Sequence, residues 1–309
     1  MKQNIKFKSK HIVIVGMGIQ GKKRKKVLGK DFIASVDIDK NKDKFKSLSD
    51  IPKIRYDGVY ICVPDNQKKK IINNALNCGK HVLVEKPLIL KEKDIDYFKN
   101  LTRKKNLVLY TAYNHRFEPG ILKIKKILDK KLIGKTYYCK IFYGNGTSLL
   151  VKKNKWRDKG QGVITDLGSH LIDLCILFFG EKISSFKILR SNKFENKAPD
   201  HAILEINYKK FKIILEVSLC SWKNSFYIDL YGSKGSLHLD SLCKWSQSVL
   251  SIRRRILPAG KPKETKFIFE KGDRTWKLEK LYFEKLMNSK KNFFPLKDKI
   301  ISNFLNNLK

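Results

Sequence analysis

The sequence lacks long hydrophobic runs and cysteine motifs. Its longest nearly apolar stretch, Leu171–Phe179, is interrupted by Asp173 and is far shorter than the roughly 20 residues of a membrane-spanning helix. The six cysteines include no CxxC pair and no His/Cys cluster, so neither a metal site nor a disulfide framework is expected. The basic N-terminal segment is followed by no apolar segment other than a strand. We therefore expect no signal peptide, no membrane association and a cytoplasmic location with reduced thiols.

Acidic residues are scarce: 29 Asp and Glu stand against 67 Lys and Arg, which gives a formal net charge of +38. Such an excess could attract a polyanion. Only ten of the basic residues are Arg, however, and the lysines are spread along the chain among many Asn and Ile. Aromatic residues are not regularly interleaved with them, as a nucleic-acid stacking surface would require. We interpret the charge as a compositional bias, expect no specific nucleic-acid partner, and expect a field that favours an anionic cofactor or substrate.

The 309 residues, 42% of them hydrophobic, suffice for two globular domains, which we place at residues 1–118 and 119–309. In the first part, short apolar runs alternate with segments of helical spacing, which indicates a doubly wound parallel sheet of the α/β class. The expected strands are residues 11–15, 32–36, 59–63, 81–84 and 107–112.

After Pro119 the strands become longer and alternate in polarity. Ala202, Leu204, Ile206 and Tyr208 recur at every second position, which is typical of a sheet with one covered face. A hairpin turn is expected at residues 232–235, so the second domain is predicted to be α+β. The expected strands are residues 135–143, 183–189, 202–208, 211–218 and 226–231, and the expected helices are residues 121–128, 276–287 and 300–308.

A glycine-rich turn follows the first strand. In GxGxxG turns the first glycine makes the bend, the second lets the backbone approach a pyrophosphate, and the third lets helix pack on strand. Asp37 ends the second strand and can accept hydrogen bonds from the adenosine ribose. Its charge would repel a 2′-phosphate, which favours NAD over NADP, although Lys40 nearby acts in the opposite sense. The motif, which makes the turn and opens the following helix, consists of Gly16, Met17, Gly18, Ile19, Gln20 and Gly21.

The same stretch nearly matches a phosphate loop, because Gly16, Gly21 and Lys22 fit GxxxxGK. Position 23 is Lys rather than the Ser or Thr that holds magnesium, so a nucleotide hydrolase is not expected. The basic run 22–26 fits the solvated face of a helix better than a nucleic-acid contact.

A strand runs directly into Glu85, Lys86 and Pro87. The carboxyl ends of strands in a doubly wound sheet line the ligand crevice, so Lys86 would lie beside a nicotinamide and Pro87 would fix the turn. An ordinary surface lysine is the alternative, and spacing alone favours neither.

A helix is expected to begin near Thr165. Asp166, His170 and Asp173 would then share one face, while a separate apolar face packs on the core. A histidine one turn from a carboxylate suits proton transfer near neutral pH. The alternative, which we favour less, is an N-terminal acid that stabilises the helix dipole and a histidine without a role.

Along nearly its full length the chain resembles the Gfo/Idh/MocA family, named after glucose–fructose oxidoreductase, inositol dehydrogenase and a rhizopine-catabolism protein. The segments that carry the resemblance are the glycine turn, Asp37, Val63-Pro64, and residues 79–87 (GKHVLVEKP), 113–119 (YNHRFEP) and 162–173.

The resemblance implies a Rossmann domain followed by an open, mainly antiparallel sheet through which homo-oligomers form, as dimers or tetramers. It also implies reversible hydride transfer between NAD(P) and a sugar or polyol carbon. Lys86 would hold and polarise the reacting hydroxyl, His170 would exchange the proton, and Asp166 would orient both substrate and histidine. Asn114 and Arg116 would lie near the substrate.

By the same resemblance, Val63, Pro64 and Glu85 join the glycine turn in binding the cofactor. Trp156-Arg157 resembles a subset of enzymes that act on cell-surface polysaccharides, which favours a sugar or nucleotide-sugar substrate. The family commonly has a histidine where this chain has Lys68.

Three alternatives remain open: a non-catalytic, dinucleotide-binding regulatory protein on the same fold, a polyanion-binding protein, and an enzyme that reduces an imine or a non-sugar carbonyl.

Overall fold

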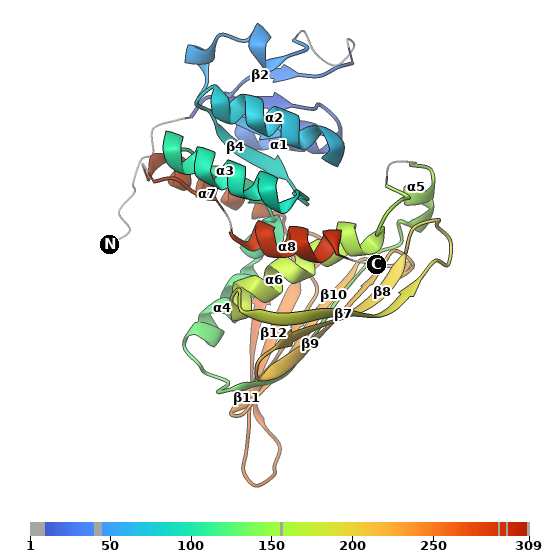
Figure 1. The fold of residues 1–309 in the computed structure, drawn as a ribbon. Helices are drawn as coiled ribbons and strands as arrows, with labels where there is room; N and C mark the ends of the chain where they lie inside the picture. Colours follow the sequence, from blue (N-terminus) through green and yellow to red (C-terminus); the bar gives the residue numbers. More distant parts are fainter. Residues whose placement is uncertain (1–9, 40–44, 155–156, 290, 295, 308–309) are drawn as a thin grey trace. The chain divides into compact units, whose positions relative to one another are not determined.

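The computed structural model describes residues 10–39, 45–154, 157–289, 291–294 and 296–307 (Figure 1). The contacts divide the chain into two compact units. The first contains the described residues up to Asn114 together with Trp276–Asn306, and the second contains His115–Thr275 and Asn307. Each unit is described by itself.

The first unit is built on a parallel five-stranded sheet, which confirms the predicted fold class. The strand order places β1 between β2 and β3, so the chain changes direction across the sheet between β1 and β3. Ligands of such sheets bind outside the carboxyl ends of the strands at this switch point. In spatial order the strands are β2 (Phe32–Val36), β1 (Ile12–Val15), β3 (Gly58–Ile61), β4 (His81–Glu85) and β5 (Leu109–Ala112).

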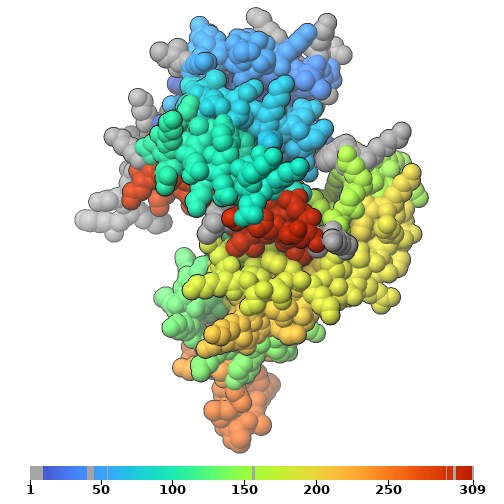
Figure 2. All heavy atoms as spheres, in the orientation of Figure 1, coloured from blue at the N-terminus to red at the C-terminus, as the bar shows by residue number. Residues whose placement is uncertain are grey.

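Helices cover both faces of this sheet because alternate strand residues point to opposite sides. Val13, Val59 and Val82 pack in one apolar cluster, which includes residues of α2 and α3; side chains of these helices cover the near face in Figure 2. Ile14 and Tyr60 belong to a second cluster. The helices of the unit are α1 (Ile19–Leu28), α2 (Asp65–Asn77), α3 (Glu92–Lys105), α7 (Thr275–Asn288) and α8 (Leu296–Asn306), with 3-10 turns at Gly29–Asp31, Leu48–Asp50 and Lys53–Arg55.

Helices α7 and α8 belong to the first unit, although the expected division into residues 1–118 and 119–309 places them in the second. The apolar cluster beside α1 includes Phe283 and Met287 of α7, since α1 alone buries little: only Gly21, Arg24 and Leu28 of its ten residues are buried. In α8, the hydroxyl of Ser302 donates to the carbonyl oxygen of Leu88. Burial of the second sheet face therefore brings α7 back to the first unit, and α8 is held there by its contact with Leu88.

The second unit contains an eight-stranded sheet that is antiparallel except where β6 and β9 run parallel. The predicted hairpin at residues 232–235 is confirmed, since Gly232 pairs with Gly235. Strands β12 and β13 were not expected. In spatial order the strands are β13 (Lys263–Phe269), β12 (Ser248–Arg254), β11 (Gly235–Asp240), β10 (Ser225–Gly232), β6 (Thr136–Gly144), β9 (Phe211–Ser218), β8 (His201–Tyr208) and β7 (Ile183–Asn192).

Helices α4 (Pro119–Asp129) and α6 (Ser169–Phe179) pack against one face of this sheet. The packing is close: a methyl group added at Gly120 of α4 would lie 2.5 Å from Leu239 of β11. In α6, the carbonyl oxygen of Cys175 accepts from the hydroxyl of Tyr208. This face therefore forms the core of the unit, with the short helix α5 (Ser148–Lys152) preceding the segment that leads to α6.

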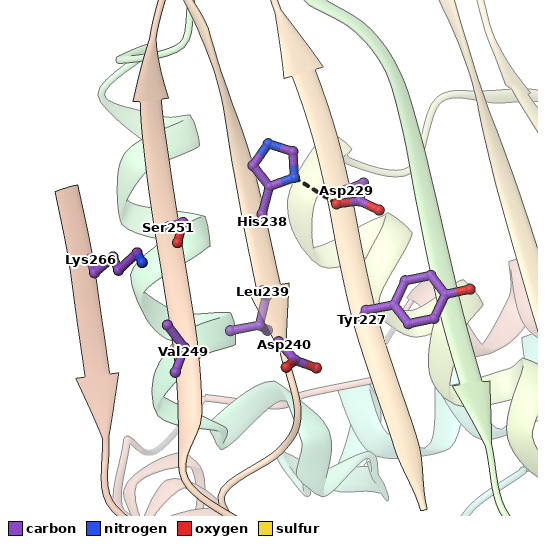
Figure 3. Close-up of a pocket in the computed structure, with 8 residues that line it drawn as sticks. All are labelled: Tyr227, Asp229, His238, Leu239, Asp240, Val249, Ser251 and Lys266. Carbon is purple, nitrogen blue, oxygen red and sulfur yellow. Dashed lines mark hydrogen bonds and ion pairs between the residues drawn. The ribbon is translucent and has the colours of Figure 1, made fainter. Parts of the chain in front are cut away.

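The other face of the sheet carries half-buried and exposed side chains. Tyr138 stacks on Tyr231, and Phe142 stacks on Tyr227, between neighbouring strands β6 and β10. A shallow hollow lies beside Tyr227 (Figure 3). Its lining residues are Tyr227, Asp229, His238, Leu239, Asp240, Val249, Ser251 and Lys266. In the described part of the chain, no helix has the length and apolar composition to cross a membrane.

Candidate active site

The glycine turn connects β1 to α1 and needs glycine at its first and third positions. Gly16 has φ +94, and a Cβ there would lie 2.6 Å from the carbonyl oxygen of Cys62. A Cβ at Gly21 would lie 2.0 Å from the carbonyl oxygen of Gly16. These contacts explain the two glycines by packing within the unit.

Gly18 is different, because a Cβ added there would meet nothing within 4 Å. Ile19 and Gln20 then begin α1, whose first turn holds no acidic residue. Exposed N–H groups and the positive end of the helix dipole therefore face the space beside Gly18. This arrangement fits the pyrophosphate of a dinucleotide.

Asp37 follows β2 and supports the glycine turn. Its Oδ2 accepts from the N–H of Met17 at 2.7 Å, and its Oδ1 accepts from the N–H of Asp39 at 3.0 Å. An ionised carboxylate has about four lone-pair sites, so these bonds are compatible with the expected contact to ribose hydroxyls. Lys40 lies outside the described residues.

Val63 and Pro64 join the same edge of the sheet, after β3. A Cβ at Gly16 would lie 3.0 Å from Cγ1 of Val63, so this side chain lines the glycine turn. Pro64 is the N-cap of α2. The structure thus brings together the predicted residues that follow β1, β2 and β3.

The carboxylate of Glu85, expected to bind cofactor, is ion-paired to a buried arginine. Nε of Arg24 lies 2.8 Å from Oε1 of Glu85, and its Nη1 lies 2.7 Å from Oε2 of Glu279. Arg24 is 1% exposed, and its guanidinium lies 4.3 Å from the ring of Trp276. Burial raises the pKa of Glu279, and Arg24 opposes that shift. Arg24 of α1 therefore connects Glu85 of β4 to Glu279 of α7.

Lys86 follows β4 and is half-buried. The main chain around it is contacted by Lys68 of α2, whose ammonium donates to the carbonyl oxygens of Glu85 and Pro87. The sequence motif predicted the place of Lys86, whereas no local signal predicted that Lys68 supports it.

In the second unit, the helix expected near Thr165 begins with a π-helical turn, Ile164–Gly168, and continues as α6. The preceding Gly162 has φ +48, and a Cβ there would lie 2.2 Å from the carbonyl oxygen of Pro199. This close approach requires glycine. It places Asp166 in the π-turn and His170 in the first turn of α6.

Each acid of the predicted face has an arginine partner. Oδ2 of Asp166 lies 2.5 Å from Nη2 of Arg157, and Oδ2 of Asp173 lies 2.6 Å from Nε of Arg116. Asp173 is 1% exposed, which makes this second pair a buried anchor between α6 and the 3-10 turn Asn114–Phe117. Arg116, expected near substrate, therefore also holds α6 in place.

His170 is 6% exposed and stacks on His115, with ring centroids 4.0 Å apart and planes inclined by 20°. Nζ of Lys244 lies 2.9 Å from Nε2 of His115 and 3.4 Å from the hydroxyl of Tyr143. An ammonium only donates, so Nε2 of His115 accepts from Lys244. Burial raises the pKa of Tyr143, and Asp166 adds to the shift.

His115, Tyr143 and Lys244 were missed in the sequence. His115 lies within the 113–119 motif and could have been singled out, whereas Tyr143 and Lys244 belong to distant segments without a motif. Asn114 is 9% exposed and ends the first unit. Trp156 lies outside the described residues.

Comparison with known proteins matches both parts of the chain to one family. The model described as "Oxidoreductase family, NAD-binding Rossmann fold" matches residues 10–113, and the model described as "GFO/IDH/MocA C-terminal domain" matches residues 121–238.

Among curated proteins, the chain is 30% identical over 189 residues to an uncharacterized oxidoreductase of Schizosaccharomyces pombe, covering 58% of this chain and 51% of that protein. It is 24% identical to myo-inositol 2-dehydrogenase of Thermotoga maritima, covering 60% and 57%. The matches span from 35% to 55% of the length of four curated oxidoreductases.

Solved structures share the fold. A levoglucosan dehydrogenase in complex with NADH and L-sorbose superposes with a TM-score of 0.81 at 16% identity, over 96% of this chain and 94% of that one. A UDP-N-acetylglucosamine 3-dehydrogenase of Acidithiobacillus ferrooxidans superposes with a TM-score of 0.78 at 16% identity, over 97% and 96%. At this identity the likeness establishes the fold alone.

Proposed function

Because the chain belongs to the Gfo/Idh/MocA family of NAD-binding oxidoreductases, we propose that it is a dehydrogenase acting on a secondary alcohol. The reaction transfers hydride between nicotinamide and a carbon of a sugar, nucleotide sugar or polyol. The observation that carries this proposal is the presence in one chain of a glycine turn with open space at Gly18 and of a buried histidine, His170, stacked in a polar cluster.

NAD, when bound, supplies the hydride acceptor. Asp37 is the basis for preferring NAD to NADP, since its carboxylate at the end of β2 repels a 2′-phosphate. The glycine turn binds the pyrophosphate, and Val63, Pro64 and Glu85 complete the cofactor side.

The side chains perform the proton chemistry. Lys86 donates a hydrogen bond to the substrate hydroxyl and stabilises the negative charge that develops on its oxygen. His170 accepts the hydroxyl proton, and the ring of His115, which contacts Lys244, stacks against it. Asp166, held by Arg157, orients substrate and histidine. General-base catalysis of this kind is worth about 10²–10⁴ in rate.

The substrate side includes Asn114 and Arg116, and we propose a sugar or nucleotide sugar as the ligand class. Trp156-Arg157 supports this choice by resemblance to enzymes of cell-surface polysaccharides. The formal charge of +38 favours approach of phosphate-bearing ligands by long-range electrostatics.

We propose further that the chain acts in the cytoplasm as a homodimer or homotetramer assembled through the open sheet face. This face presents the stacked pairs Tyr138–Tyr231 and Phe142–Tyr227, and aromatic side chains are enriched at interfaces. Light scattering of the purified protein would give the subunit number, and Y138E combined with Y227E should yield monomers.

The decisive experiment identifies any dinucleotide that copurifies with the protein and then follows the absorbance of reduced cofactor against free sugars, inositols and nucleotide sugars. Turnover with a member of this panel supports the proposal. NAD binding without turnover on the whole panel would favour a regulatory protein, and turnover only with imines or non-sugar carbonyls would identify a different substrate class.

A further inference from the structure

We propose that Lys68 is a positioning residue, which fixes the main chain on both sides of Lys86 and so sets where the Lys86 ammonium lies. This inference rests on the proposed function of Lys86, but its structural basis is independent of it.

Lys68 reaches this segment because of the sheet order. It lies in the first turns of α2, which follows β3, and β3 pairs with β4. Its side chain therefore extends across the carboxyl edge of the sheet to the end of β4. Its Nζ lies 2.6 Å from the carbonyl oxygen of Glu85 and 2.7 Å from that of Pro87.

The third contact of the ammonium is an ion pair, 2.6 Å from Oδ1 of Asp65. An ammonium has three donors, so Glu85, Pro87 and Asp65 match its capacity. Two of the three acceptors are the backbone carbonyls that flank Lys86, which makes the contact specific for this stretch of main chain.

Lys68 is 3% exposed, and burying a charged amine is unfavourable unless it is paired and hydrogen-bonded. Burial lowers the pKa of Lys68, Asp65 opposes the shift, and the nearby positive charge of Lys86 adds to it. The three contacts offset the cost of burial, and an apolar side chain of similar size would leave the carbonyl oxygens of Glu85 and Pro87 without this donor.

The expected consequence is geometric. A displacement of about 1 Å in a positioning group costs about 10²-fold in rate, and the Lys86 side chain extends from the main chain that Lys68 contacts. Loss of the Lys68 donors would let this backbone shift while the glycine turn stays intact.

The test compares K68M, which removes the donors, with K68Q, which keeps an amide donor without charge. The control is K69M, the neighbouring lysine of α2, whose side chain is 56% exposed. We expect kcat to fall about 10- to 100-fold in K68M, to recover partly in K68Q, and to stay unchanged in K69M, with the NAD dissociation constant within about threefold of wild type in all three.

Two results would overturn the proposal: wild-type kcat in folded K68M, or a loss in K68M matched by an equal loss of NAD affinity. If K68M does not fold, the kcat of K68Q tests the proposal. A kcat of K68Q as low as that of K86M would contradict positioning by a hydrogen bond.

A second readout separates this proposal from the proposed function. The rate at which acetic anhydride modifies Lys86, followed by mass spectrometry of the full-length protein, should change in K68M and stay near wild type in K69M. If the wild type shows no turnover but this rate changes, the proposed function fails and the positioning role stands. An unchanged rate contradicts the positioning role itself.

Discussion

The two units of this protein build the sites that we propose in them in different ways. In the first unit, the cofactor side is made largely of backbone: a contiguous glycine turn whose first and third members are fixed by contacts under 3 Å and whose second, Gly18, is open. In the second unit, the surroundings of His170, the proposed base, are built from side chains of separate segments, including His115, Tyr143 and Lys244.

A site made of backbone groups is therefore specified by one short segment of the sequence, whereas a site made of side chains is specified by residues far apart in the sequence. A backbone site needs only small residues at fixed spacing. A side-chain site needs partners that the fold brings together, here through the buried pair Arg116–Asp173. Changes at His170 should therefore affect chemistry, and changes in the glycine turn should affect binding.

The largest effect is expected for H170A. Loss of the general base should lower kcat by about 10²–10⁴ and leave NAD affinity near wild type, since the glycine turn belongs to the other unit. Steady-state kinetics and titration of NADH fluorescence measure the two quantities. The control H201A removes a histidine from β8. Equal turnover in H170A and H201A would remove the proposed role.

The second prediction concerns G18A, which should weaken NAD binding. Its methyl group enters open space, so the free energy of unfolding should stay near wild type, while NAD affinity should fall about 10- to 100-fold because overpacking against a ligand costs about 1–3 kcal/mol. G21A, whose methyl group would lie 2.0 Å from a carbonyl oxygen, should instead destabilise the fold. Urea unfolding and calorimetric titration distinguish them. Wild-type NAD affinity in G18A would contradict the cofactor assignment.

D37N tests whether Asp37 sets the preference for NAD over NADP. Replacing the carboxylate removes a charged acceptor and the repulsion toward a 2′-phosphate, so NAD affinity should fall about tenfold and the preference for NAD over NADP should decrease. Titration with both cofactors measures this ratio. An unchanged ratio would mean that Asp37 serves only the N–H groups of Met17 and Asp39.

The smallest expected effect is the change in the free energy of unfolding with pH that arises from His81. Burial lowers the pKa of His81 from 6.5 to about 4, and its Nδ1 accepts from the N–H of Val108. Between these two pH values His81 binds a proton in the unfolded chain and stays unprotonated in the folded chain. Its contribution to the free energy of unfolding is therefore complete above pH 6.5 and is lost as the pH falls toward 4, by about 2–3 kcal/mol. Urea unfolding at neutral pH and near pH 4 should show this loss in wild type and a smaller one in H81N. Equal losses would contradict it.

The fold was largely predictable because its signals are local. Each expected strand of the first sheet is present, since short buried runs between helices have few alternatives. The membership of α7 in the first unit was not predictable, because its partners Ile14 and Tyr60 are more than 200 residues away in the chain. Global burial, rather than local pattern, decided that placement.

The candidate site was predictable to a lesser degree. Spacing identified His170 and Asp166 but assumed a regular helix, where a π-turn forms beside the close contact of Gly162 with Pro199. The sequence motifs contain the arginine partners of the acids, Arg116 and Arg157, but no local signal predicts that they pair with Asp173 and Asp166. The spacing of the glycines, in contrast, was sufficient to predict the turn between β1 and α1.

The central claim, that Lys86 and His170 act in the same chemical step, is tested most directly by a double-mutant cycle. Groups that act as a unit in one transition state are strongly non-additive. The account predicts that kcat of the K86M/H170A double variant lies within about tenfold of the slower single variant. Losses that multiply across the two positions would contradict it and would assign the two residues to separate steps.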